Sequence, residues 1–186
     1  MAEKIPSSAA LSMKNELNLY AKSWVDDRVV ATLCKNLKSN KSITFLGFRN
    51  CTNVSNKSAI VLSKLLGSER FRPAALKKLI LEFTSVGDLG VIALASSLNS
   101  TSLERLDFGQ CSNVGNDGAI ALAEAIADNT SLRFLVLQNC KKITDEGGIK
   151  MLEAIKKNST MKSITIQGTG ISASLRREIA AELKGR

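Results

Sequence analysis

The chain contains no histidine among its 186 residues. Histidine is the side chain that most often acts as a general base near neutral pH and as a zinc ligand, so many enzyme mechanisms and zinc sites are excluded. The four cysteines, Cys34, Cys51, Cys111 and Cys140, show no Cys-x-x-Cys spacing that would indicate a metal site. We therefore expect no metal, no cofactor and free thiols in a structural role.

Sequence motifs of catalysis are also missing. The chain has no phosphate-binding GxxxxGK[ST], no GxSxG and no HExxH. The acidic pairs Asp26-Asp27 and Asp145-Glu146 precede predicted helices, where a negative charge is stabilising by about 0.3–1 kcal/mol. We interpret these pairs as structural and predict that the protein is not an enzyme and has no catalytic residues.

Aromatic residues and long hydrophobic runs are scarce. Aromatics make up 4% of the chain against 44% hydrophobic residues, so the core must consist mainly of Leu, Ile, Val and Ala. No apolar run approaches the ~18 residues of a membrane span, and the N-terminal sequence has no apolar signal-peptide core. We expect a soluble, monomeric protein of a reducing, cytoplasmic compartment. A microbial effector delivered into a host cytosol would look the same.

One nine-residue pattern recurs along the chain. Its copies are KNELNLYAK, ITFLGFRNC, LKKLILEFT, LERLDFGQC, LRFLVLQNC and MKSITIQGT, which start at residues 14, 43, 76, 103, 132 and 161. Alternation of apolar and other residues in the middle of each copy predicts a short strand with one buried face. The period of about 29 residues lies at the upper end of the range for leucine-rich repeats.

Between the strands the hydrophobic period changes to that of a helix. Ala119, Leu122, Ala123 and Ile126 fall at positions i, i+3, i+4 and i+7, which is one helical face. Equivalent sets are Val30/Leu33/Cys34/Leu37, Ala59/Leu62/Ser63/Leu66, Val91/Leu94/Ala95/Leu98 and Gly148/Met151/Leu152/Ile155. Asn40, Asn99, Asn129 and Asn158 follow the predicted helices. We predict that these asparagines adopt the left-handed conformation that ends a helix.

The alternation of LxxLxLxxC with segments such as NVGNDGAIALAEAI and KITDEGGIKMLEAI resembles the ribonuclease-inhibitor type of leucine-rich repeat, which also occurs in NOD-like receptors, Ran GTPase activators and tropomodulins. The resemblance implies an α/β fold, a curved horseshoe-shaped solenoid of about six repeats with a parallel sheet on the concave face and helices on the convex face. It also implies that Cys51, Cys111 and Cys140 hydrogen-bond the loop that leaves each strand. It specifies a scaffold and no particular chemistry.

The repeats organise the chain into one domain over residues 14–186, after an N-terminal tail or cap over residues 1–13. A solenoid must cover its open core at both ends. We expect Tyr20 and Trp24 to do so in the first unit and the charged segment 173–184 in the last. The longest connection is GSERFRPAA over 67–75. Loops often carry binding, and Arg70, Phe71 and Arg72 leave that role open, but we favour a tolerated insertion whose Phe71 folds back onto the core.

The outward positions of the predicted strands mix aromatic, aliphatic and charged residues. Exposed aromatics beside arginine are typical of protein-binding hot spots, although single exposed apolar residues are also ordinary. We therefore predict a non-catalytic protein-protein interaction module that binds a protein partner on its concave face. The candidate partner-binding residues are Phe45, Arg49, Lys78, Ile80, Arg105, Asp107, Phe134, Val136 and Gln138.

Two other functions stay open at this point. One is regulation of a GTPase, as in the Ran activators that the repeats resemble. The other is binding to an anionic surface such as nucleic acid or acidic lipid, which the net charge of +9 suggests, and charge complementarity to an acidic protein surface also stays open. Nucleic acid is disfavoured because both ends of the chain are basic while the unit from residue 103 is acidic, whereas a nucleic-acid groove needs a continuous basic stripe.

Overall fold

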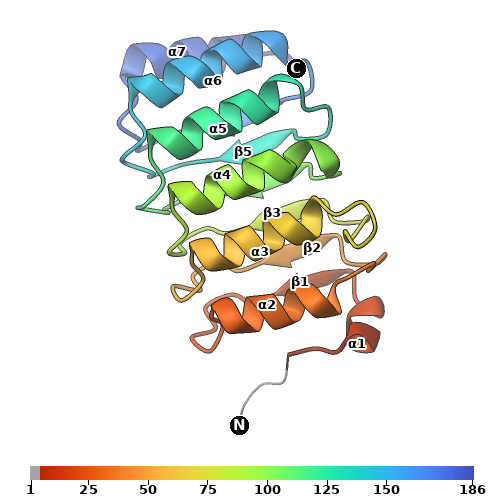
Figure 1. Cartoon of the computed structure of the whole chain (residues 1–186). Helices are drawn as coiled ribbons and strands as arrows, with labels where there is room; N and C mark the ends of the chain where they lie inside the picture. Colours follow the sequence, from red (N-terminus) through yellow and green to blue (C-terminus); the bar gives the residue numbers. More distant parts are fainter. Residues whose placement is uncertain (1–4) are drawn as a thin grey trace.

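The computed structural model describes residues 5–186. Short strands alternate with helices throughout the chain. The elements are α1 (Ser8–Ser12), β1 (Glu16–Asn18), α2 (Asp27–Asn36), β2 (Phe45–Gly47), α3 (Asn56–Leu66), β3 (Lys78–Ile80), α4 (Asp88–Ser97), the 3-10 turn η1 (Leu98–Ser100), β4 (Arg105–Asp107), α5 (Asn116–Ala127), β5 (Phe134–Val136), α6 (Asp145–Lys157), β6 (Ser163–Thr165) and α7 (Ala173–Glu182). The strands form one parallel sheet in sequence order, β1 to β6, and helices α2 to α7 form the other layer (Figure 1). The predicted α/β leucine-rich-repeat solenoid is confirmed.

The strand register places equivalent repeat positions side by side in all six strands. Leu17 pairs with Leu46, Leu46 with Leu79, and the column continues through Leu106 and Leu135 to Ile164. These side chains are all buried between the sheet and the helices. We call the opposite side of the sheet the sheet face, which is the side predicted to be concave, and the outer side of the helical layer the helix face.

The predicted helical faces pack on this column. In α5, Ala119, Leu122, Ala123 and Ile126 are all buried. The equivalent residues of α2, α3, α4 and α6 are buried as well. The period-3.6 pattern therefore identified the core side of each of these helices correctly.

The chain leaves every strand through a residue in the left-handed conformation. This position is Ala21, Asn50, Phe83, Gln110, Asn139 and Gly168 in successive units, with φ between 53° and 73°. The backbone still extends the inter-strand ladder there, since the Phe83 N–H donates to the Gly109 carbonyl at 2.8 Å. Only Gly168, and to a lesser degree the two asparagines, suit this backbone without strain.

The prediction of left-handed asparagines after the helices was wrong. Asn40, Asn99, Asn129 and Asn158 all lie outside the left-handed region. Asn129 is buried instead, and its Oδ1 accepts from the Leu132 N–H at 2.6 Å, while its Nδ2 donates to the Leu98 carbonyl of the previous unit at 3.3 Å. Asn40 and Asn158 fold their turns in the same way. The amide satisfies backbone groups that burial would otherwise leave unpaired.

The cysteines form a hydrogen-bonded ladder between units. Cys51 Sγ donates to the Leu19 carbonyl at 2.9 Å, and Cys111 and Cys140 donate in the same way to carbonyls of the units before them. All four cysteines, Cys34 included, are free and buried. Burial raises the pKa of Cys34 and of Cys140 to about 12, so both stay protonated. This geometry supports the structural role.

The two ends of the described chain are covered as expected except at Tyr20. At the N-terminal end, α1 places Leu11 in the core, where it is fully buried, and Trp24 packs partly buried against the same cluster. Tyr20 does not take part in this cover, because its side chain is exposed on the sheet face. At the other end, α7 buries Leu175 and Ile179 beneath its charged outer side.

Candidate functional site

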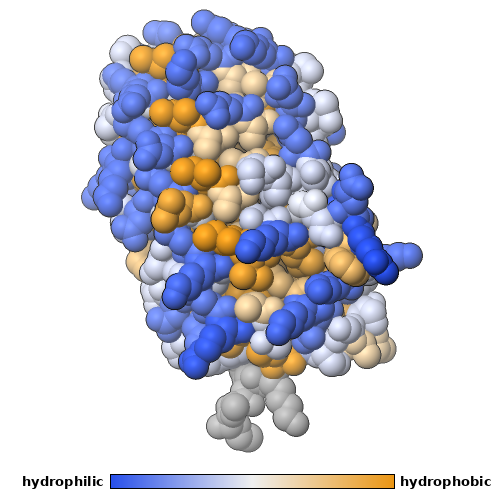
Figure 2. Space-filling view, in the orientation of Figure 1, coloured by the Kyte–Doolittle hydropathy of each residue, from blue (hydrophilic) through white to orange (hydrophobic). Residues whose placement is uncertain are grey.

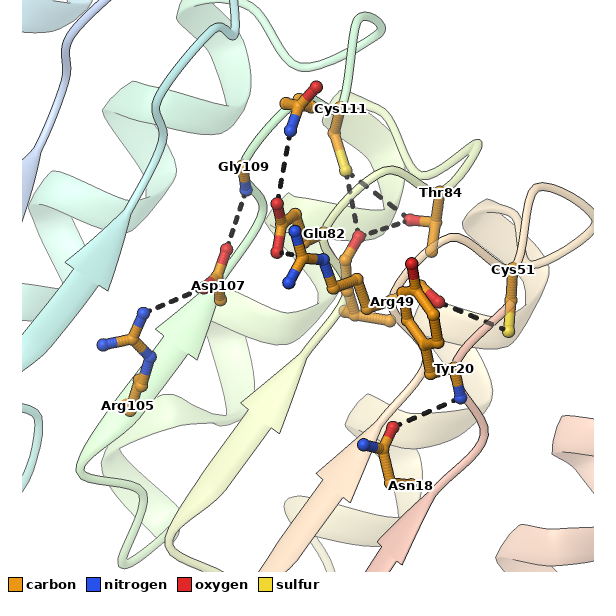
Figure 3. Close-up of polar contacts among 12 residues, drawn as sticks. Asn18, Tyr20, Arg49, Cys51, Glu82, Thr84, Arg105, Asp107, Gly109 and Cys111 are labelled. Carbon is orange, nitrogen blue, oxygen red and sulfur yellow. Dashed lines mark hydrogen bonds and ion pairs between the residues drawn. The ribbon is translucent and has the colours of Figure 1, made fainter. Parts of the chain in front are cut away.

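The parallel register gathers charged side chains of neighbouring units on the sheet face. Arg49 follows β2 and Glu82 follows β3, and Arg49 Nε lies 3.0 Å from Glu82 Oε2. Gln110, from the next unit, donates through Nε2 to Glu82 Oε1 at 3.2 Å (Figure 3). Three successive repeats therefore contribute to one polar cluster. Glu82 is buried with both of its oxygens engaged.

A second ion pair lies beside the first, within β4. Arg105 Nη2 donates to Asp107 Oδ2 at 3.1 Å, and Asp107 Oδ1 accepts from the Gly109 N–H at 2.9 Å. A side chain at Gly109 would start 3.2 Å from Asp107 Oδ1 and 3.4 Å from the Glu82 side chain. Glycine at this position thus leaves room for two buried carboxylates.

Ion pairs reduce the net positive charge that the arginines give to this surface. Arg49 and Arg105 each lie against a carboxylate, so neither offers an isolated positive charge. Lys78 is exposed on β3 and makes no ion pair within residues 5–186. This mixed pattern suits a polar protein surface better than the uniform charge of a phosphate backbone.

A hollow of about 430 Å³ opens on the sheet face over β1 to β3. Its lining includes Asn18, Tyr20, Phe45, Arg49, Ile80 and Glu82. The Arg49 guanidinium carbon lies 5.8 Å from the centroid of the Tyr20 ring, within the range of a cation–π contact. The hollow therefore presents aromatic surface, a cation and a carboxylate next to one another.

The predicted site residues differ in their exposure. Arg49 and Lys78 are exposed, Phe134 is 37% exposed, and Phe45, Arg105 and Gln138 are half-buried. The expectation that Ile80 and Val136 are exposed apolar residues was wrong, because they retain only 9% and 7% of their accessible surface. Asp107 is also buried. Side chains on adjacent strands lie only about 4.8 Å apart, so small side chains are shielded by larger neighbours.

Phe45 shows this shielding directly. A Cβ placed on Gly47 would lie 2.7 Å from the Phe45 ring, so the ring folds over the glycine and loses exposure. The hollow brings Phe45, Arg49, Ile80 and Asp107 together. The remaining predicted residues, Lys78, Arg105, Phe134, Val136 and Gln138, do not line it.

The set predicted from the sequence lacks several residues of this surface, among them Asn18, Tyr20 and Glu82. Tyr20 is predicted in the N-terminal cover, and Glu82 is absent from the set although it pairs with Arg49. Both occupy the repeat position of Arg49 and Gln138, two residues after the second outward position of the strand. Reading that column as a whole would have found them.

Two features that often mark functional sites are not found in the described part of the chain. No group of three or more Cys, Asp or Glu side chains within residues 5–186 has the arrangement of a metal site. None of the buried side-chain polar atoms there lacks a hydrogen-bond partner. Over the same residues, no helix is both long and apolar enough to cross a membrane.

Comparisons with known proteins agree with this architecture. The family model described as Leucine Rich repeat matches residues 99–123 and 128–152. No curated protein sequence matches the chain. Among solved structures, leiomodin-1 actin-binding site 2 aligns with a TM-score of 0.57 at 16% identity, over 91% of this chain and 78% of that chain.

Two further structures are similar. The C-terminal domain of Caenorhabditis elegans tropomodulin aligns with a TM-score of 0.55 at 15% identity, over 91% of this chain and 82% of that chain. A chain of the yeast Rad7–Elc1 complex aligns with a TM-score of 0.55 at 19% identity, over 81% of this chain and 42% of that chain. At these identities the similarity shows a shared fold, and the repeat type read from the sequence agrees with it.

Proposed function

We propose that the chain is a non-catalytic interaction module that binds a protein partner on its sheet face. A leucine-rich-repeat scaffold has no chemistry of its own, so its function depends on the surface that it presents. The supporting observation is the hollow over β1 to β3, where Tyr20 and Phe45 lie beside the Arg49–Glu82 pair. Tyrosine and arginine are enriched in binding hot spots, and these occupy pockets that a partner can desolvate.

The arrangement favours a protein over an anionic polymer. The exposed Tyr20 ring offers apolar contact area, while Arg49 keeps donors available beside Glu82. A partner with both polar groups and an apolar anchor would match this surface. Phe134 and Lys78 extend the candidate surface beyond the hollow, since both are exposed and lie in the same outward column as Phe45.

Actin is the first candidate to test as partner, because one of the similar structures is an actin-binding site of leiomodin-1. The test is direct binding of purified actin to the chain by cosedimentation and by a monomer-binding assay. Actin binding that is lost in the Tyr20→Ala, Phe134→Ala variant described below would support actin as the partner. Absence of binding would leave the sheet face to be tested with partners found by affinity purification.

Two variants probe the surface without removing core residues. Tyr20→Ala combined with Phe134→Ala truncates exposed aromatics on the sheet face, whereas Ile149→Ala truncates an exposed residue on the helix face. We expect the first variant to reduce partner binding by at least tenfold and the second to leave it unchanged. Equal binding by all three proteins, with unchanged circular dichroism spectra, would refute the sheet-face assignment.

A further inference from the structure

A second hollow surface lies on the helix face, in the furrow between α2 and α3. One hollow of about 430 Å³ is lined by residues from the C-terminal halves of the two helices and by Phe71. A second, of about 490 Å³, lies toward the helix N-termini and shares Ala31 and Val61 with the first. The two hollows therefore form one continuous furrow. Figure 2 shows hydrophobic side chains reaching the surface between hydrophilic ones over these helices.

The floor of the furrow is apolar. Ala31 and Val61 are half-buried, and Cys34 and Leu65 are buried beneath them. Phe71 stays at the surface with 36% of its area exposed, so the expectation that it folds onto the core was wrong. Its ring lies near two cations instead.

Phe71 has two cationic neighbours. Lys38 Nζ lies 4.9 Å from the ring centroid, and the Arg70 guanidinium carbon lies 5.2 Å from it. These contacts keep a large ring at the rim of the furrow, because a cation over an aromatic face is attracted to it. The insertion over 67–75 thereby adds an aromatic wall to the furrow.

The rim at this end is basic. Lys35, Lys38 and Lys64 line it, and none of the three pairs with a carboxylate within the described residues. Lys35 and Lys64 lie in the last turns of their helices, where a positive charge offsets the helix dipole. Lys38 follows the C-cap Leu37 and lies at the same end of α2. The helix dipole does not account for the apolar floor that these lysines border.

The other end of the furrow has a different charge. Asp26, Asp27, Arg28 and Lys57 line it, and Asp26 is already paired with Arg28 at 3.0 Å. Unpaired positive charge is thus concentrated toward the C-termini of α2 and α3. A ligand that fills the furrow would place its negative groups at that end.

We propose that the furrow between α2 and α3 binds an acidic amphipathic segment of a partner protein. Its apolar side chains contact Val61, Leu65 and Phe71, and its carboxylates face Lys35, Lys38 and Lys64. Insertion of an amphipathic helix into an apolar groove is a common mode of peptide recognition. This surface lies on the side opposite the sheet face, so the proposed site is separate from the one proposed there.

The test uses two synthetic 12-residue peptides with the same leucine and phenylalanine positions. One carries glutamate at its polar positions and the other carries lysine. Each is titrated into the ¹⁵N-labelled 186-residue chain while amide chemical shifts are recorded. We expect the glutamate peptide to shift amides of α2, α3 and the 67–75 connection, and the lysine peptide to shift none of them. Shifts confined to the sheet face would overturn the proposal.

Matched variants separate the site from general electrostatics. Lys38→Glu with Lys64→Glu changes the rim, and Lys156→Glu with Lys157→Glu makes the same change of charge at the end of α6. We expect the first pair to weaken binding of the glutamate peptide at least tenfold and the second to weaken it less than twofold. An equal effect of the two pairs would overturn the proposal.

The apolar floor and the identity of the occupant have their own controls. Phe71→Ser should weaken binding at least fivefold, whereas Ile149→Ser, on the helix face of α6, should not change it. Tyr20→Ala with Phe134→Ala should also leave peptide binding intact, so failure of the sheet-face proposal can be told apart from failure of this one. Sedimentation equilibrium showing a dimer that Phe71→Ser dissociates would assign the furrow to a second copy and overturn the proposal.

Discussion

Asp88 and Gly118 belong to successive repeats, and Asp88 Oδ1 accepts a hydrogen bond from the Gly118 N–H at 3.0 Å. The same oxygen accepts from the Gly115 N–H at 2.7 Å. Asp88 is the first residue of α4, while Gly115 and Gly118 lie at the start of α5. A carboxylate of one helix therefore satisfies free N–H groups of the next.

This relationship repeats along the whole array. Asp27, Asn56, Asp88, Asn116 and Asp145 all reach the N-terminal N–H groups of the following helix. The free N–H groups at a helix start need partners, and here the neighbouring unit provides them. The acidic residues before the predicted helices thus do more than offset a dipole, because Asp27 and Asp145 join units together.

Removing one member of this ladder should destabilise the fold. We expect Asp88→Ala to lower the free energy of unfolding by about 1–3 kcal/mol, since it leaves two N–H groups without their acceptor. Asp117→Ala, in the first turn of α5 and exposed, loses only a dipole interaction of about 0.3–1 kcal/mol. Urea denaturation of both variants measures the difference. Equal losses would contradict the role of the ladder.

Asp27 should make stability depend on pH. Burial raises the pKa of Asp27, but hydrogen bonds from the hydroxyl and N–H groups of Ser55 and Ser58 outweigh it, so the pKa lies below its usual value of 3.8. A lowered pKa in the folded state stabilises the fold above the unfolded pKa, and that contribution is lost as the pH falls through the folded pKa. We expect the stability difference between the wild type and Asp27→Asn to be constant near neutral pH and to shrink below about pH 4.

Asn56 provides the control for this pH dependence, because it occupies the same ladder position, does not titrate and accepts only from the backbone N–H groups of Gly87 and Gly90. The destabilisation caused by Asn56→Ala should therefore not change over the pH range in which Asp27 titrates. Thermal melts of the three proteins between about pH 3 and pH 7 test both expectations. A difference for Asp27→Asn that stays constant down to pH 3 would show that its carboxylate is not linked to folding.

Phe83 carries backbone strain that a substitution can relieve. Its φ is 56°, a left-handed conformation that costs an ordinary residue about 1–2 kcal/mol, and its ring is largely exposed. Asn50 and Asn139 occupy the same position in other units. We expect Phe83→Asn to raise the free energy of unfolding by about 0.5–1 kcal/mol. Phe134→Asn, an exposed phenylalanine in extended β5, is the control and should bring no gain.

The cysteines should be unreactive in the folded protein. Burial raises the pKa of Cys34 and Cys140 to about 12 and raises that of Cys51 and Cys111 as well, so little thiolate forms at pH 8. We expect Ellman's reagent to label none of the four within minutes at pH 8 and all four in guanidinium chloride. Rapid labelling of the native chain would show that a ladder thiol is accessible.

Much of this protein can be predicted from its sequence because each repeat is a local unit that contacts only its neighbours. The spacing of the nine-residue pattern gave the positions of all six strands, and the apolar period gave the buried face of the helices. The strand register agrees with the repeat spacing, since Phe45, Lys78 and Arg105 occupy the same position of their repeats and pair with one another. Such features depend only on short-range alternation of apolar residues.

The tertiary structure decided how side chains of different units share space. Phe45 lies over Gly47, and Ile80 is shielded by its neighbours, which no pattern within one repeat specifies. The furrow between α2 and α3, with Phe71 at its rim, likewise depends on how two helices and an insertion pack together. The sequence alone determined the scaffold because its periodicity is local, whereas exposure and hollow surfaces depend on contacts between units and were decided only by their packing.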